Sequence, residues 1–255
     1  MFKVAERVQI RDELIASARQ DVDIAGAALV GSTARGTEDR WSDIDLVLQL
    51  AENANEAAVV ARWTRSLDEK FGVADTLDVI SREGVRYRVF LLGSSLQVDV
   101  SFWPHELFRA TEDSFQLVFG QANEPTRAPK PGSEQVIGMA WLYALHARSA
   151  IARGRTWQAV LMLDDLRTQI IALECLRHGL NPWHGREVDQ LPAPVLETLR
   201  DGRAASVGLD ELERSRQVLL QHYLAVVEHH DAERAVALRR ALDPVQRGAG
   251  GTTNC

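Results

Sequence analysis

The chain has 255 residues, a formal net charge of −7, and ordinary proportions of apolar (45%) and charged (25%) residues. This length suffices for one large domain or two modest ones, and the composition is typical of a globular protein. No apolar run approaches the roughly 20 residues that span a membrane, and charged residues interrupt the N-terminal segment where a signal peptide would be apolar. Two cysteines, Cys175 and Cys255, are too few for a disulfide framework. We therefore expect a cytoplasmic protein with no membrane partner.

The acidic residues are concentrated in the first half of the chain. Residues 1–130 contain 21 acidic and 15 basic side chains, whereas residues 131–255 contain 15 and 14. A protein that grips a nucleic-acid backbone normally carries a basic footprint. The composition therefore argues against a nucleic-acid partner and suits a small ligand better, including a cationic one.

Helical and strand patterns alternate in the first half. The spacing of apolar residues predicts two amphipathic helices, at 2–20 and 52–71. Strands are predicted in five runs, at 24–30, 43–50, 76–80, 85–92 and 96–102. The last two strands are joined by Gly93-Ser94-Ser95 and are expected to form a hairpin. These elements predict a mixed sheet with helices packed on it.

A segment rich in proline and glycine, at 120–132, precedes a second half with helical periodicity throughout. Helices are predicted there in five runs, at 133–154, 156–178, 193–201, 209–229 and 231–242. The predicted fold class is therefore α+β, with an N-terminal mixed sheet and an all-α C-terminal helical bundle. We assign the chain to four segments: a sheet domain at 1–122, a Pro-rich linker at 123–132, a helical domain at 133–245 and a disordered tail at 246–255.

The predicted strand at 24–30 ends at Gly31-Ser32, where a turn is expected. Glycine lets the backbone turn sharply and lets a ligand approach closely. Successive backbone amides in such a turn can form a concave nest for an anion, and Ser32 adds a hydroxyl. Arg35 lies in the next loop and is a further phosphate candidate. A Gly-Ser pair alone is common, so its meaning depends on the residues near it in the chain.

Ten residues after this pair come Asp43 and Asp45, at the start of the next predicted strand. Residues i and i+2 of a strand point to the same face, so the two carboxylates project side by side. They repel each other unless a positive charge lies between them. Mg²⁺ is usually held by one or two carboxylates together with substrate phosphates. The turn and the carboxylate pair together predict a site for a nucleoside triphosphate and its metal.

A third carboxylate, Asp99, is the only charge in the alternating run at 96–102. It shares one strand face with Gln97 and Ser101. An aspartate among β-branched residues is costly to bury unless it is paired or binds a metal. The plainer interpretation is an exposed strand face, which the sequence pattern by itself leaves open.

The ordered set of a strand, Gly31-Ser32, ten residues and Asp43-x-Asp45 on a second strand resembles the signature of the nucleotidyltransferase superfamily of the DNA polymerase beta type. The resemblance covers about residues 24–102. The order of sheet domain, linker and helical domain also resembles the aminoglycoside and lincosamide antibiotic nucleotidyltransferases, in architecture only.

This resemblance implies an Mg²⁺-dependent enzyme that moves AMP from ATP, or NMP from another NTP, to a hydroxyl of a small molecule and releases pyrophosphate. The acceptor it implies is an aminoglycoside-type antibiotic. Asp43, Asp45 and Asp99 would hold two Mg²⁺ ions, and Asp99 would be a metal ligand, the base for the attacking hydroxyl, or both. Gly31, Ser32 and Arg35 would bind the nucleotide, and the helical domain would close over the substrates.

Three further carboxylates are weaker candidates for holding the acceptor. Glu106 follows the third aspartate in the chain, and Asp164 and Asp165 interrupt an apolar helix. The latter pair could equally form ion pairs with Arg167 or Arg148. The acceptor, the nucleobase preference and the oligomeric state are not determined by the sequence.

Other functions are compatible with the same patterns. A protein adenylyltransferase of a toxin–antitoxin pair would use the same site to modify a hydroxyl group of a partner protein. A regulatory module would bind the nucleotide without catalysing a reaction. Arg177 and His184 also loosely resemble the Arg…His motif of HEPN ribonucleases, although their spacing is loose.

Overall fold

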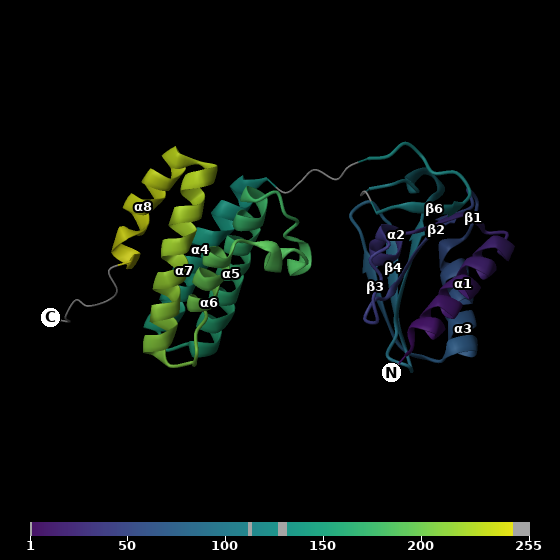
Figure 1. Ribbon diagram of the computed structural model, residues 1–255, viewed down its shortest axis with the longest axis horizontal. Coiled ribbons are helices and arrows are strands. Elements are labelled where there is room, and N and C mark those ends of the chain that lie inside the picture. The colour runs from purple at the N-terminus through teal and green to yellow at the C-terminus, as the bar shows by residue number, and fades with distance from the viewer. Residues whose placement is uncertain (1, 112–113, 127–131, 247–255) are drawn as a thin grey trace. The chain divides into compact units, whose positions relative to one another are not determined.

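The computed structural model describes residues 2–111, 114–126 and 132–246 (Figure 1). The chain divides into two compact units, Met1–Pro129 and Lys130–Cys255. Residues 127–131 of the predicted linker, and all but the first residue of the predicted tail, lie outside the described residues.

A six-stranded sheet organises the N-terminal unit (Figure 1). Its strands are β1 (Ile24–Leu29), β2 (Ile44–Leu50), β3 (Val73–Ile80), β4 (Arg86–Leu92), β5 (Gln97–Trp103) and β6 (Gln116–Phe119). They lie in the order β3-β4-β5-β2-β1-β6. Strands β2 and β5 run parallel and the other neighbouring pairs run antiparallel, so the sheet is mixed, as predicted.

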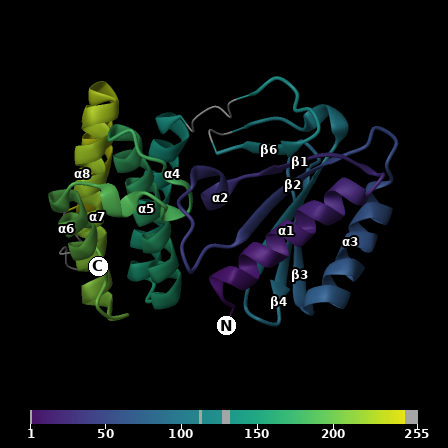
Figure 2. The same cartoon turned by 45° about the vertical axis from the view of Figure 1, so that its right-hand side comes forward.

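Helices α1 (Val4–Gln20) and α3 (Glu56–Phe71) cover one face of this sheet (Figure 2). Their buried side chains form a single core with alternate residues of the strands, including Val98, Val100 and Phe102 of β5. Because side chains alternate along a strand, Gln97 and Asp99 point to the opposite face. The face that carries Asp99 is therefore the face without these two helices.

A smaller core covers part of that second face. It consists of Ala28, Val47, Val85, Trp103 and Phe108. The segment after β5, with a short 3₁₀ turn η1 (His105–Leu107), supplies part of this cover. The end of the face that carries Asp99 is only half-buried.

The C-terminal unit is helical. Its α-helices are α4 (Ser133–Ala152), α5 (Thr156–Arg177), α6 (Ala193–Asp201), α7 (Leu209–His230) and α8 (Ala232–Gln246), with 3₁₀ turns η2 (Trp183–Gly185) and η3 (Val188–Gln190). Helices α4, α5 and α7 supply most of its buried side chains. Alanines on the buried side of α4, such as Ala140 and Ala144, leave room for close packing of its neighbours. Cys175 is fully buried in this core, as the sequence predicts. None of the helices described here is long and apolar enough to cross a membrane.

The α+β fold class is confirmed, and two short elements were not predicted. Helix α2 (Gly31–Arg35) occupies the position where the sequence indicates a turn. Glycine and threonine are poor helix formers and five residues are too few for a stable isolated helix, so tertiary contacts must hold α2 in place. Strand β6 has four residues and pairs only at the edge of the sheet, where its sequence carries little alternation.

Candidate active site

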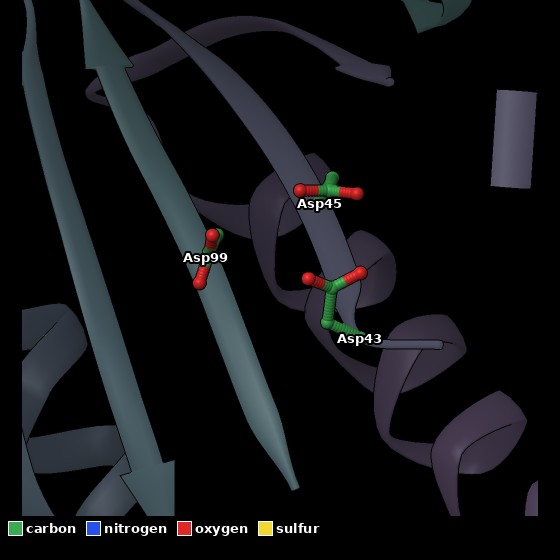
Figure 3. Close-up of side chains that lie close together, drawn as sticks. All are labelled: Asp43, Asp45 and Asp99. Atoms are coloured by element: carbon green, nitrogen blue, oxygen red, sulfur yellow. The ribbon is translucent and has the colours of Figure 1, made fainter. Parts of the chain in front are cut away.

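Asp43, Asp45 and Asp99 gather on the second face of the sheet (Figure 3). One carboxylate oxygen of each lies within 4.8 Å of the others. Asp45 on β2 is in register with Asp99 on the parallel neighbour β5. Asp43 immediately precedes β2, and its spacing of two from Asp45 puts it on the same face. The strand alternation predicted from sequence therefore brings all three carboxylates together.

Among the described residues, no basic side chain forms an ion pair with Asp99. The pKa of Asp99 is raised from its ordinary value of 3.8 to about 6, first of all by burial and also by the charge of Asp43, while a hydrogen bond from Gln97 acts in the opposite direction. The Gln97 amide donates to the two carboxylate oxygens at 3.0 and 3.2 Å. A divalent cation among the three carboxylates would supply the missing positive charge.

The turn after β1 lies directly beside Asp45. Gly31 has a φ of 65°, in the left-handed region that favours glycine. A Cβ atom at this position would lie 1.9 Å from Oδ2 of Asp45, so any other residue would displace the Asp45 carboxylate. The backbone N–H of Val30 also donates to the carbonyl oxygen of Asp45, at 3.2 Å. Gly31 is thus required both for the turn and for its close approach to the carboxylate.

The Ser32 hydroxyl is a buried polar group beside this turn. Its oxygen has no hydrogen-bond partner among the described residues. Buried hydroxyls are nearly always hydrogen-bonded, so an unpartnered one calls for an explanation. Arg35, at the end of α2, is exposed and forms no ion pair within the described part of the chain. Both side chains are placed where a ligand could still use them.

The donor set fits a divalent metal with a triphosphate. Every side-chain ligand in the cluster is a carboxylate oxygen, which suits Mg²⁺ rather than a metal that prefers nitrogen or sulfur. Asp43, Asp45 and Asp99 are the residues that would hold the metal. The glycine turn and the Ser32 hydroxyl lie beside them, as a phosphate site requires.

A buried arginine, which the sequence analysis missed, holds the loop that leads to Asp43. Arg7 of α1 is 2% exposed. Its Nη1 donates to the backbone carbonyl oxygens of Asp39 and of Ser42, the latter at 3.1 Å. Its Nη2 forms an ion pair with Glu38 at 3.4 Å. Because Ser42 immediately precedes Asp43, Arg7 fixes the backbone from which that carboxylate projects.

The same loop is tied to the phosphate turn. The Thr33 hydroxyl of α2 donates to Oε1 of Glu38 at 3.0 Å, and Glu38 is in turn paired with Arg7. The sequence did contain a signal for this arginine. Arg7 precedes the buried residues Ile10 and Leu14 of α1 at helical spacing, so it falls on the buried face of an amphipathic helix. A charge on such a face indicates a specific partner.

The predicted acceptor-binding carboxylates do not join this cluster. Glu106 is exposed in η1, and among the described residues the acidic group contains the three aspartates alone. In the helical unit, Asp164 pairs with Arg167 at 2.5 Å, which decides between the two partners that the sequence left open. Asp165 is half-buried on α5. A role for these residues in acceptor binding stays a prediction.

The helical unit contains a buried carboxylate of a different kind, which the sequence did not reveal. Glu174 of α5 is 2% exposed, and its Oε1 lies 2.8 Å from Nε2 of His222 on α7. Its Oε2 lies 3.4 Å from Arg177 and 3.7 Å from His178. Burial by itself would raise the pKa of Glu174, but the His222 hydrogen bond and the neighbouring charges bring it below its ordinary value.

The Arg177 and His184 side chains have different neighbours. Arg177 pairs with Glu174, whereas the His184 ring stacks on Trp183 with 4.8 Å between ring centroids. These contacts give no support to an Arg–His ribonuclease site.

The comparison with protein families agrees with the site. Residues 11–116 match the family model described as nucleotidyltransferase domain, a span that includes Gly31 and all three aspartates. Among solved structures, an aminoglycoside 6-adenyltransferase from Bacillus subtilis is 9% identical, with a TM-score of 0.42, over 97% of this chain and 98% of that chain. The comparison with curated proteins found no match.

Proposed function

We propose that this chain, which belongs to the nucleotidyltransferase superfamily through its domain at residues 11–116, transfers AMP from ATP to a hydroxyl group of a small molecule. Pyrophosphate would be the second product. One observation carries this proposal: the glycine turn abuts Asp45 within a cluster of three carboxylates. A triphosphate and its metal need these two features side by side.

The proposed reaction assigns a role to each residue of the site. The hydroxyl oxygen of the acceptor attacks the α-phosphorus of ATP, the bond from that phosphorus to the bridging α–β oxygen breaks, and pyrophosphate leaves. Gly31 and Ser32 hold the departing phosphates, with Arg35 as an exposed cation close to them. Asp43 and Asp45 would hold Mg²⁺, which would neutralise charge on the phosphates. Asp99 accepts the proton of the attacking hydroxyl, or shares the metal, or does both.

The nature of the acceptor is supported by charge. An acidic first half disfavours a nucleic-acid acceptor, because backbone phosphates would be repelled. A small molecule is therefore the acceptor that we propose. Aminoglycoside-type and lincosamide-type antibiotics are the first compounds to test, because the sequence resembles the enzymes that modify them.

Label transfer tests this function. The full chain is incubated with Mg²⁺ and α-labelled ATP against a panel of aminoglycosides and lincosamides, with Asp45→Asn as the control. A labelled small molecule that the control does not produce would support the proposal and identify the acceptor. Label on a protein would instead favour a toxin–antitoxin adenylyltransferase. Full activity in Asp45→Asn would overturn the metal assignment.

A further inference from the structure

The sheet face that carries the aspartates continues beyond them as an apolar surface. In register across the sheet, Asp45 on β2 lies beside Asp99 on β5, and Asp99 lies beside Val89 on β4. Val89 in turn lies beside Leu77 on the edge strand β3. Residues in register share a face, so these four side chains form one row from the carboxylates to the edge of the sheet.

One neighbouring row adds Val79 on β3 and Tyr87 on β4, and the other adds Leu91 on β4 opposite Asp75 on β3. We use the name site-side apolar surface for five side chains: Leu77, Val79, Tyr87, Val89 and Leu91. Four of them are exposed: Leu77 by 61%, Val79 by 50%, Tyr87 by 37% and Leu91 by 46%. Exposed apolar side chains scattered singly need no explanation, but a contiguous group beside an active site does.

The other face of the same hairpin is built differently. There Arg86 and Arg88 form ion pairs with Asp78, and Arg88 also donates to the Thr64 hydroxyl of α3. The polar side chains of the hairpin thus satisfy one another on the side of α3. The alternation of β3 and β4 leaves the apolar side chains on the side of the aspartates.

The site-side apolar surface is too small to be explained by a second copy of the chain alone. A stable protein–protein interface takes roughly 20–30 residues from each partner. Five side chains on two adjacent strands match the size of a small molecule instead. Val89 is in register with Asp99, and Tyr87 and Leu91 are in register with its same-face neighbours Ser101 and Gln97, so the surface continues the site.

The order of the strands determines which substrate would lie there. Gly31 follows β1 and lies against Asp45 on β2. If Gly31 holds the departing pyrophosphate, as the proposed function has it, the pyrophosphate would lie on the β1 side of the carboxylates. In a phosphoryl-type displacement, the attacking and leaving oxygens are roughly in line. The attacking hydroxyl must then approach from the opposite side, over β5. The rest of the acceptor extends over β4 and β3.

We propose that the site-side apolar surface binds the acceptor, an inference that rests on the proposed function. The acceptor is then an amphiphile, with its reactive hydroxyl beside an apolar ring or alkyl group. Asp75, which is in register with Leu91, is the one carboxylate that shares these rows on β3 and β4. A polycationic sugar without an apolar face would find little there to bind. The surface therefore restricts the proposed acceptors from all small molecules with a hydroxyl group to those that also have an apolar part.

A matched pair of glucosides tests this inference on the full chain. Methyl and n-octyl β-D-glucoside, the latter below its micelle concentration, are titrated calorimetrically into protein loaded with Mg²⁺ and an ATP analogue that has an α–β methylene bridge. The test variant is Leu77→Thr/Val79→Thr. Ile80→Thr is the control, because Ile80 is adjacent on the same strand, is equally exposed at 52%, and points to the other face.

The proposal predicts that octyl glucoside binds the wild type at least about tenfold more tightly than methyl glucoside, because alkyl burial is favourable. The double variant should lose most of that difference, whereas Ile80→Thr should keep it. Equal binding of the two glucosides, or equal losses in the two variants, would overturn the proposal. A wild-type dimer that the double variant turns into a monomer would also overturn it, by assigning the surface to a second copy.

Failure of the proposed function would look different. In that case the ATP analogue would not bind, or would bind without Mg²⁺ dependence, whatever the glucosides show. Loss of the glucoside difference with normal Mg²⁺-dependent nucleotide binding would contradict only the acceptor surface.

Discussion

Both units of the chain bury carboxylates, but they surround these charges in opposite ways. In the N-terminal unit, Asp99 lies among other carboxylates, accepts hydrogen bonds from Gln97, and has a raised pKa. In the helical unit, Glu174 lies against His222 and near further basic side chains, and has a lowered pKa. The first arrangement favours the binding of a cation, whereas the second is satisfied within the fold.

The difference separates a functional charge from a structural one. Asp99 is largely desolvated beside Asp43 and forms no ion pair in the described part of the chain, and a charge in such surroundings favours a bound cation. A buried carboxylate with hydrogen-bonded basic partners needs no ligand. Mutations that remove one charge from each cluster should therefore have opposite effects on stability.

The largest effect is expected for Asp99→Asn. Loss of a proton acceptor or metal ligand should lower nucleotidyl transfer by roughly 10²–10⁴-fold. The metal-free protein should become more stable, by about 1 kcal/mol, because a desolvated charge that is repelled by Asp43 disappears. Label transfer and urea unfolding in the presence of a chelator measure the two effects. Lower stability of Asp99→Asn under those conditions would contradict the comparison.

Glu174→Gln should affect the other unit in the opposite direction. Removing a buried carboxylate that serves several side chains as a hydrogen-bond acceptor should cost about 3 kcal/mol, because a buried partner is left unsatisfied. Here that partner is His222, which is 8% exposed. Urea unfolding of the full chain, followed by helical circular dichroism, measures the loss.

Asp164→Asn is the matched control on the same helix. Asp164 also pairs with an arginine, but its side chain is 58% exposed, so its removal should cost at most about 1 kcal/mol. If the two variants lost equal stability, burial would not be what distinguishes the Glu174 cluster.

A smaller effect is expected for Arg7→Lys. Lysine keeps the charge but lacks the planar fork that reaches two backbone carbonyl oxygens and Glu38 at once. We expect about 1–3 kcal/mol of lost stability and weaker binding of Mn²⁺, which electron paramagnetic resonance can measure in place of Mg²⁺. Arg11→Lys is the control, since Arg11 also pairs with Glu38 but is more exposed. Unchanged Mn²⁺ affinity in Arg7→Lys would show that the loop holds Asp43 without this arginine.

The sequence predicted those features that local periodicity determines. Alternation in the runs at 43–50 and 96–102 put Asp43, Asp45 and Asp99 on single strand faces, and the sheet then aligned them. The fold class followed from the change of period after residue 132. The Gly-Ser turn was recognised, although its conformation as helix α2 was not.

Features that depend on contacts between distant segments were not predicted. Periodicity places Arg7 on a buried face but cannot name the loop carbonyls that it binds. Glu174 and His222 meet only because α5 packs on α7. The site-side apolar surface could not be predicted without the strand order. Leu77 and Asp99 lie in one row because β4 lies between their strands.

The pH dependence of stability gives the smallest and most direct test of the comparison. Asp99 has a raised pKa, so between about pH 4 and 6 the folded state binds more protons than the unfolded state, and stability falls as the pH rises through this window. Glu174 has a pKa below its ordinary 4.5, so its contribution is present above that pH and is lost as the pH falls through the folded-state value. The two slopes therefore have opposite signs.

Thermal unfolding of three proteins resolves the two slopes. From pH 4 to 7 without metal, wild type should lose stability relative to Asp99→Asn, and saturating Mg²⁺ should remove that loss because bound cation favours the charged carboxylate. Below pH 4.5, wild type should lose its advantage over Glu174→Gln, and Mg²⁺ should have no influence on this change. Shifts of about 2–4 °C per kcal/mol are expected for units of this size. Slopes of the same sign would mean that both carboxylates are structural, and the metal assignment would lose its electrostatic support.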